Sequence, residues 1–185
     1  IARVQAVLSA AGATRLEVSQ DEAQRLRFWS GRKNAFPASG RISPDYMCMD
    51  STIPRKRLAD ILLAIQAMEQ RYGLRCANVF HAGDGNLHPC VLFDERDPDE
   101  VRRVMEVGEE ILKLCIRVGG SITGEHGIGM EKIDVMPLLF SETDIKFMET
   151  VKEIFNSNTL CNPGKLFPTS KSCVEVKWRP KAAYV

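Results

Sequence analysis

Two extended apolar runs, joined by a short glycine-rich turn, place the strongest constraint on how this chain can fold. The runs are residues 74–81 and 87–93, and the segment between them reads Ala-Gly-Asp-Gly-Asn. Strand-forming runs separated by so few turn residues predict a β-hairpin, in which the two strands pair antiparallel. We therefore expect the chain to contain an antiparallel sheet.

Helical periodicity on both sides of this hairpin indicates the rest of the fold. One apolar stripe follows Pro54 and ends at Gly73, and a longer amphipathic pattern over residues 101–118 is closed by two glycines. Further helices are predicted at residues 1–11, from 19–22 through Arg32, and at 141–156, with short extended segments at 13–18, 46–53 and 121–123. This mixture predicts an α+β fold: an antiparallel sheet with helices packed on it and a C-terminal helical segment.

Length and charge narrow the class of protein. The 185 residues suffice for one domain, predicted over residues 1–168 and followed by a basic, unperiodic tail at 169–185. The net charge of +1 does not indicate nucleic-acid binding. No apolar run reaches the roughly 20 residues of a transmembrane helix. Because the sequence opens at Ile1 within a helical pattern, we expect a fragment of a longer protein.

The six cysteines show no Cys-x-x-Cys spacing. Disulfide frameworks and thiolate zinc sites normally have shorter, paired spacings, so buried free thiols in a reducing cytoplasm are predicted. On this interpretation the cysteines are not expected to bind a metal.

The chain has only three histidines, and all lie in glycine-rich turns beside carboxylates. His81 and His88 flank the turn of HAGDGNLHP, and His126 follows Glu125 in TGEHGIG. A hairpin brings the two ends of its turn together, so the imidazoles of His81 and His88 can reach one metal ion. Histidines packed at a hairpin end, or an exposed Glu-His pair at a turn, are the structural alternatives.

Glu125 would complete a His-His-Glu ligand set that suits zinc, manganese or iron(II) and leaves coordination positions open. Adjacent residues of an extended segment point to opposite sides, so Glu125 and His126 are not expected to be equivalent ligands. One as a ligand and the other as a proton-transfer group is the more natural division, and the pKa of histidine suits the second role.

Two further segments carry weaker signals. Arg32, in a stretch with an aromatic residue and a second cation, has the planar fork that grips carboxylates, although a solvated helix face explains it nearly as well. The segment Asn162-Pro163-Gly164-Lys165 reads as a loop that reverses the chain.

Several of these segments together resemble a known family. HAGDGNLHP, TGEHGIGMEK and CNPGKLFP, in this order and spacing, are similar to the C-terminal part of FAD-linked oxidases in the vanillyl-alcohol oxidase-like superfamily. WSGRKNAFPASGR and MDSTIPRKRL most resemble the flavin subunit of bacterial glycolate oxidases and the D-lactate dehydrogenases. The similarity extends over roughly residues 1–168.

The resemblance implies a ferredoxin-like cap domain over the flavin, with the FAD-binding domain upstream and the first strand of the cap absent. It implies that His81, His88 and Glu125 bind a divalent metal and that His126 takes the hydroxyl proton. It further implies that Arg32 binds the substrate carboxylate. The predicted cofactor contacts are Asn86 and Asn162.

The resemblance also implies a substrate. Relatives that act on 2-hydroxyglutarate have a lysine just before the Asp-x-x-x-Pro segment, where this chain has Met47-Cys48-Met49 before Asp50. A small 2-hydroxy monocarboxylate, glycolate or D-lactate, is therefore expected, with hydride passing to FAD. The isolated chain is expected to be inactive.

Two other functions stay open at this point. The chain could be a stand-alone His/His/Glu metallohydrolase, active without flavin, or an assembly module without chemistry of its own. The resemblance further implies other oxidase subunits as partners and a cytoplasmic location, at the inner membrane face through those subunits. A sheet edge left exposed by the absent strand would favour a homodimer.

Overall fold

The computed structural model describes residues 1–168, which form two compact units, residues 1–38 and the part of the chain from Ser39 onward. The predicted tail at 169–185 lies outside the described residues. In the first unit, helices α1 (Ala2–Ala10) and α2 (Glu22–Lys33) bury no residue. Asp21 caps α2 through its side chain, which accepts from the amide of Gln24 at 2.7 Å. A short helix, α3 (Ala35–Ser39), follows.

The strand predicted at residues 13–18 is not formed. That segment has no regular secondary structure, and no described strand pairs with it. Alternation alone cannot make a strand, because the backbone amides and carbonyls of a strand need a partner.

The sheet of the second unit is built around the second strand of the predicted hairpin. Strand β3 (Arg75–His81) runs antiparallel to β4 (Asn86–Phe93), which confirms the hairpin. The other edge of β4 pairs first with β1 (Asp45–Cys48) and then with β2 (Ser51–Thr52). The extended segment predicted at 46–53 is therefore interrupted at Met49 and Asp50.

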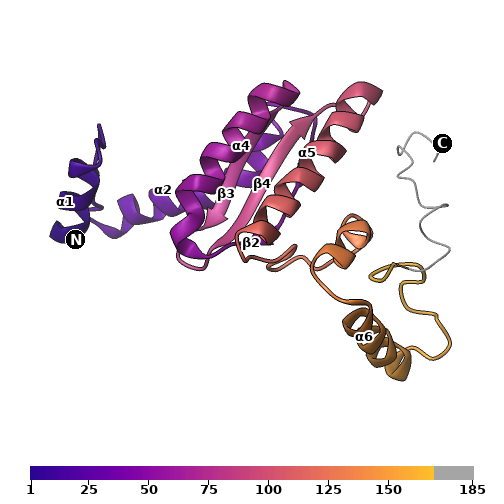
Figure 1. Cartoon of the computed structure of the whole chain (residues 1–185). Coiled ribbons are helices and arrows are strands. Elements are labelled where there is room, and N and C mark those ends of the chain that lie inside the picture. Colours follow the sequence, from indigo (N-terminus) through magenta and orange to yellow (C-terminus); the bar gives the residue numbers. More distant parts are fainter. Residues whose placement is uncertain (169–185) are drawn as a thin grey trace. The chain divides into compact units, whose positions relative to one another are not determined.

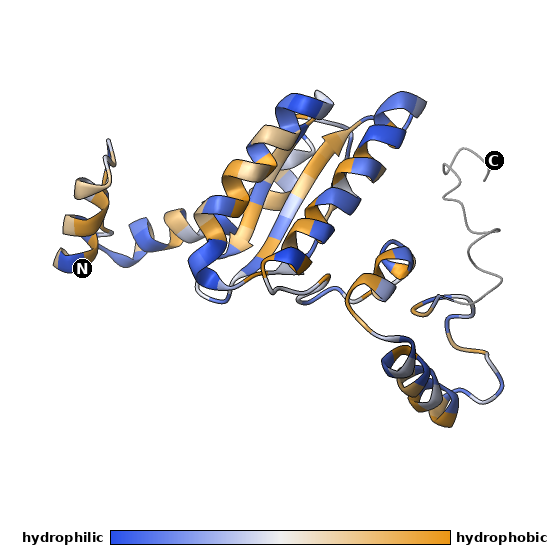
Figure 2. Cartoon of the chain, in the orientation of Figure 1, coloured by the Kyte–Doolittle hydropathy of each residue, from blue (hydrophilic) through white to orange (hydrophobic). Residues whose placement is uncertain are grey.

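Two helices lie side by side across one face of this sheet, α4 (Leu58–Tyr72) and α5 (Pro98–Arg117), as Figure 1 shows. Both begin and end as the sequence predicts. Pro54 leads into a short 3-10 turn (Arg55–Arg57) before α4, Gly73 ends α4 with a φ of 63°, and Asp97 caps α5. In Figure 2 strand β4 is mostly apolar and the outer surface of α5 is mostly polar.

The core lies between this helix pair and the sheet. Alternate residues of β4 contribute Leu87, Val91 and Phe93 to it. The helices contribute their buried stripes, with spacings of three and four residues: Ile61, Ile65 and Met68 from α4, and Val104, Val107, Ile111, Leu112 and Cys115 from α5. The alternate set, Asn86, His88, Cys90 and Leu92, therefore faces away from the helices.

The hairpin turn depends on one glycine. Gly85 has a φ of 75°, and its carbonyl accepts a hydrogen bond from the amide of Ile53 at 2.8 Å. A Cβ atom at this position would lie 2.2 Å from the carbonyl oxygen of Ile53. Gly83, the other glycine of the turn, does not need this freedom, because its φ is not positive and a Cβ atom there would meet nothing within 4 Å.

After α5 the chain passes the sheet once more. Ser121 forms a single antiparallel bridge with Thr52, so the strand predicted at 121–123 is reduced to one pair. A 3-10 helix (Ile133–Leu138) and helix α6 (Glu142–Phe155) follow, and Ser141 and Asp144 form a capping box at the start of α6. The α+β class, the antiparallel sheet and the C-terminal helix are thus confirmed. Within residues 1–168, every helix is too short or too polar to cross a bilayer.

The described cysteines are all free, but they do not share one environment. Cys90 and Cys115 are buried, Cys48 and Cys76 are partly buried, and Cys161 is exposed. The prediction of buried thiols is therefore wrong for Cys161, which lies in the loop after α6 and not in the core. Cys173 lies outside the described residues.

Candidate functional site

The hairpin places two histidines and an asparagine on the face of the sheet that the helices leave uncovered. His81 is the direct cross-strand partner of Asn86, and His88 follows two residues later on the same face of β4. The rings of His81 and His88 meet edge to face with centroids 5.5 Å apart. His88 is buried, whereas the side chain of His81 is 40% exposed. One imidazole is thus fixed within the protein and the other is open to solvent.

Glu125 reaches this pair from the loop after α5. Its Oε1 lies 3.4 Å from Nε2 of His81, and its Oε2 lies 3.9 Å from Nε2 of His88. One ligand atom from each of the three side chains falls within 4.8 Å of the others. Asn86 donates from Nδ2 to Oε1 of Glu125 at 2.7 Å, which orients the carboxylate. This donor set fits zinc, manganese or iron(II).

His126 approaches His88 from another direction. The two rings stack with centroids 5.0 Å apart and planes 19° from parallel. The argument from an extended backbone does not hold here, because residues 123–127 form a loop in which the amides of Gly124, Glu125 and His126 converge on one point. Glu125 and His126 therefore both reach His88, the first with its carboxylate and the second with the face of its ring.

The point of convergence is the carboxylate of Asp50, at the break between β1 and β2. This fully buried group accepts from Oγ1 of Thr123 at 2.6 Å and from the amides of Gly124 at 2.9 Å, Glu125 at 3.2 Å and His126 at 3.0 Å. Burial on its own would raise the pKa of Asp50, but these hydrogen bonds outweigh burial and hold the pKa well below its usual range. Asp50 stays ionised and fixes the backbone that carries Glu125 and His126.

Lys132 also contacts Asp50. Its Nζ donates to the backbone carbonyl of Asp50 at 2.6 Å and lies 3.5 Å from Oδ2 of the carboxylate. Only 2% of Lys132 is exposed, and burial lowers its pKa although Asp50 acts in the opposite direction. Sequence reasoning missed both residues. For Asp50, the available signal was a charge inside an extended, otherwise apolar segment.

Asp50 also lies beside His88, with 3.5 Å between Oδ1 and Nδ1. Burial lowers the pKa of His88 below its usual range, although the carboxylates of Asp50 and Glu125 act against this. A lowered pKa keeps the imidazole neutral near pH 7, which is the form that binds metals.

A glycine at position 124 would let a flat ligand or backbone approach closely, but the structure gives it another role. A Cβ atom at this position would lie 2.3 Å from Oδ1 of Asn86. The space beside Gly124 is therefore taken by the asparagine that hydrogen-bonds Glu125, not by a flat ligand or by backbone. Among the described residues, Oδ1 of Asn86 has no hydrogen-bond partner.

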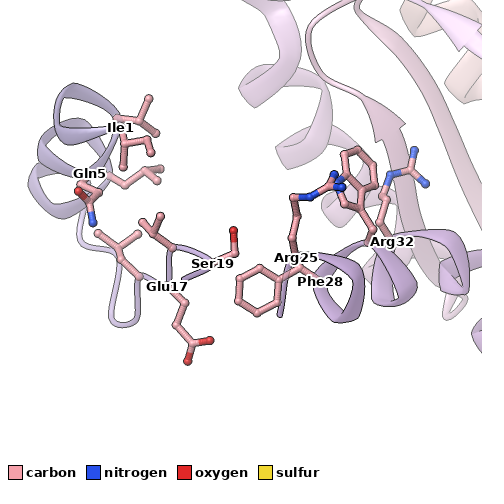
Figure 3. A pocket seen from close by; sticks show the side chains of 12 residues that line it. Ile1, Gln5, Glu17, Ser19, Arg25, Phe28 and Arg32 are labelled. Atoms are coloured by element: carbon pink, nitrogen blue, oxygen red, sulfur yellow. The ribbon is translucent and has the colours of Figure 1, made fainter. Parts of the chain in front are cut away.

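Two of the predicted residues, Arg32 and Asn162, come from other parts of the chain. Arg32 belongs to the first unit, where it lines an apolar hollow of 670 Å³ with Arg25 and Phe28 on α2 and with Ile1 and residues near it on α1 (Figure 3). Asn162 lies in the loop after α6, and its carbonyl accepts from Nζ of Lys152. No hydrogen bond, ion pair or ring contact among residues 1–168 connects Asn162 to the histidines.

One residue near the histidines was not expected from the sequence to bind a metal. Cys48, at the end of β1, presents its thiol to His88 and His126, and the ligand atoms of these three residues lie within 4.8 Å of one another. The fold thus brings a cysteine and two histidines together, although no short spacing in the sequence predicts this group.

The comparisons with known proteins identify the family of the chain. Residues 1–166 match the family described as FAD linked oxidases, C-terminal domain. Glycolate oxidase subunit GlcD of Escherichia coli strain K12 is 56% identical over 173 residues, which are 94% of this chain and 35% of the relative. The GlcD subunit of Bacillus subtilis is 33% identical, over 89% of this chain and 35% of the relative.

A mitochondrial D-lactate dehydrogenase of Arabidopsis thaliana is 26% identical over 89% of this chain and 30% of the relative. The chain thus spans about a third of the length of these relatives. Since the family match covers nearly all the described residues, the chain belongs to the FAD-linked oxidase C-terminal domain family.

Proposed function

We propose that this chain is the substrate- and metal-binding domain of an FAD-dependent 2-hydroxyacid dehydrogenase. The reaction would convert glycolate or D-lactate to the 2-oxoacid. The observation that carries the proposal is the cluster of His81, His88 and Glu125 with His126 stacked beside it, in a chain of this family. Similarity to glycolate oxidase subunits and to D-lactate dehydrogenases supports the substrate class.

The cluster suits a resident divalent cation. Two imidazoles, one kept neutral by burial, and one carboxylate oriented by Asn86 provide three ligands with positions left for substrate. When bound, the cation supplies Lewis acidity that makes the substrate hydroxyl easier to deprotonate. Glu125 and the histidines then fix where the hydroxyl lies.

His126 is the proposed base for the hydroxyl proton. Its backbone is fixed by Asp50 and its ring by the stack on His88, so its position does not depend on the substrate. Arg32 is the proposed partner of the substrate carboxylate, and Asn86 and Asn162 the proposed contacts to the cofactor. FAD would be held mainly by a region upstream of this chain and would supply the acceptor for the hydride.

Four accompanying points belong to the proposal. The order strand, helix, hairpin, helix supports a ferredoxin-like cap. Methionine and cysteine, not lysine, before Asp50 support a monocarboxylate. The GlcD relatives carry the word subunit in their names, which supports an assembly with other oxidase subunits. The free cysteines support a reducing compartment, consistent with the cytoplasm.

The test separates metal binding from proton transfer. Titration of the 185-residue chain with Mn²⁺ in a calorimeter is expected to give one site, lost in His81→Ala and in Glu125→Gln and kept in Glu131→Gln, a matched change at an exposed glutamate of the same segment. In the flavoprotein that contains this chain, His126→Asn is expected to keep Mn²⁺ and to slow flavin reduction by glycolate or D-lactate by about 10²-fold or more.

Either half of the test can contradict the proposal. A wild-type chain that binds no Mn²⁺, or a Glu125→Gln variant that binds it unchanged, would show that the cluster is not the metal site. Flavin reduction that is unchanged in His126→Asn would remove the assignment of the base.

A further inference from the structure

We infer that Cys48, His88 and His126 form a second metal site, which takes a thiophilic divalent cation such as Zn²⁺. This site shares His88 with the His81–His88–Glu125 cluster but replaces the carboxylate by a thiolate. The two sites are alternatives, because both need the same buried imidazole.

The sheet register explains why a cysteine lies here. Cys48 is the cross-strand partner of Cys90, and the amide of Met49 donates to the carbonyl of Pro89 at 3.0 Å. This pattern makes Cys48 and Cys90 a pair without mutual hydrogen bonds, in which the side chains lie close together on one face of the sheet. His88, two residues along β4, shares that face, so the thiol of Cys48 lies diagonally opposite the imidazole.

His126 closes the site from the loop. Its ring stacks on that of His88 at 5.0 Å, and the backbone hydrogen bond to Asp50 holds it there. The ligand atoms of Cys48, His88 and His126 lie within 4.8 Å of one another, against about 3.3–3.6 Å in a tetrahedral zinc site. Small side-chain rotations would close the difference. The thiol of Cys90 is fully buried and donates to the carbonyl of His88, so Cys48 provides the ligand.

The ligand types distinguish the two sites. A thiolate with two imidazoles favours zinc and other soft or borderline cations, whereas two imidazoles with a carboxylate also accept manganese and iron. On binding, the S–H bond of Cys48 breaks, the sulfur binds the cation, and the proton passes to the solvent. Zinc and manganese should therefore occupy different sites in the same cluster.

Occupation of the thiolate site would inhibit the enzyme, and this consequence rests on the function proposed above. A cation on His126 takes the lone pair that would accept the hydroxyl proton, and a cation on His88 removes a ligand from the first site. The thiolate site itself does not depend on that function, because it needs only the three side chains.

The test uses Co²⁺ as a spectroscopic probe for zinc, added to the 185-residue chain under a phosphine reductant that keeps Cys48 and Cys90 reduced. A thiolate bound to Co²⁺ gives a charge-transfer band in the near ultraviolet, which histidine and carboxylate ligands do not give. We expect this band at one equivalent, loss of the band on adding Zn²⁺, and no loss on adding Mn²⁺.

Three variants assign the band. Cys48→Ser should abolish it, whereas Cys161→Ser, a change at an exposed cysteine outside the cluster, and Glu125→Gln should keep it. Circular dichroism establishes that each variant is folded. Co²⁺ binding without a thiolate band in the wild type, or a band that survives Cys48→Ser, would overturn the inference and leave the Glu125 site standing. Absence of any Co²⁺ or Mn²⁺ binding would overturn both.

Discussion

Asp50 is the single residue on which the geometry of the candidate site most depends. Its carboxylate accepts from one hydroxyl and three backbone amides of the loop that carries Glu125 and His126, and Lys132 lies against it. Asp50 is fully buried, and only 2% of Lys132 is exposed. Buried charges of this kind are costly unless every donor and acceptor is matched, so removal of one partner has a large effect.

We predict that Asp50→Asn lowers the free energy of unfolding by about 3–5 kcal/mol, because an amide cannot accept from all four donors and leaves Lys132 buried without its counter-charge. Urea denaturation measures this change. Asp60→Asn is the matched control, since Asp60 is exposed and pairs with Arg57 on the surface; we expect a change of about 1 kcal/mol or less. Equal losses in the two variants would contradict the role given to Asp50.

A second prediction at the scale of residues follows from the pKa of Cys76. Burial, with a smaller contribution from the nearby carboxylate of Glu69, raises the pKa of Cys76 to about 12. Only the thiolate reacts with iodoacetamide, so Cys76 should stay unlabelled in the folded chain at pH 8 while the exposed Cys161 is labelled. Peptide mass spectrometry measures the labelling of both cysteines. Labelling of the unfolded chain in urea is the control, because both thiols are then accessible. Equal rates for the two cysteines in the folded chain would contradict the pKa.

At the scale of elements, the hairpin turn contains two glycines that differ in backbone conformation and in the space beside them. Gly85 combines a positive φ with a Cβ position 2.2 Å from a carbonyl oxygen, whereas Gly83 has open space and no positive φ. We predict that Gly85→Ala costs roughly 3 kcal/mol in unfolding free energy and Gly83→Ala less than about 1 kcal/mol. Thermal unfolding of both variants compares them directly, and similar losses would refute this account of the turn.

The elements also show what the sequence could predict. Helices α4, α5 and α6 and the hairpin were predicted because their signals are local: apolar stripes, capping residues and a glycine turn. The strand predicted at 13–18 failed because a strand depends on a partner that the local sequence cannot reveal.

The same distinction applies to the site. His81 and His88 share a hairpin, so their proximity followed from the turn, and the resemblance supplied Glu125 and His126. Asp50 and Lys132 are separated by 82 positions, and Cys48 meets His88 only through the register of β1 on β4. Contacts of this kind form only when distant segments pack together. No short spacing in the sequence therefore predicts them.

At the scale of the whole molecule, the site joins three distant parts of the chain. The end of β1 and the break after it contribute Cys48 and Asp50. The hairpin contributes His81 and His88, and the loop after α5 contributes Glu125 and His126. The loop meets the hairpin through the hydrogen bond from Asn86 to Glu125, the approach of Glu125 to the two histidines and the stack of His126 on His88. A cation bound by His81, His88 and Glu125 would add a cross-link between them.

We therefore predict that metal binding stabilises the fold as a whole. A ligand that binds only the native state at 100 times its Kd adds about 2.7 kcal/mol, which for a chain of this size raises Tm by roughly 5–10 °C. Differential scanning calorimetry with Mn²⁺ and then with excess chelator should show this rise and its reversal. Glu125→Gln should melt near the metal-free wild type with or without Mn²⁺, because the loop has lost its ligand. A Tm that rises equally in wild type and Glu125→Gln would mean that the cation binds elsewhere and that the loop and the hairpin are not joined by it.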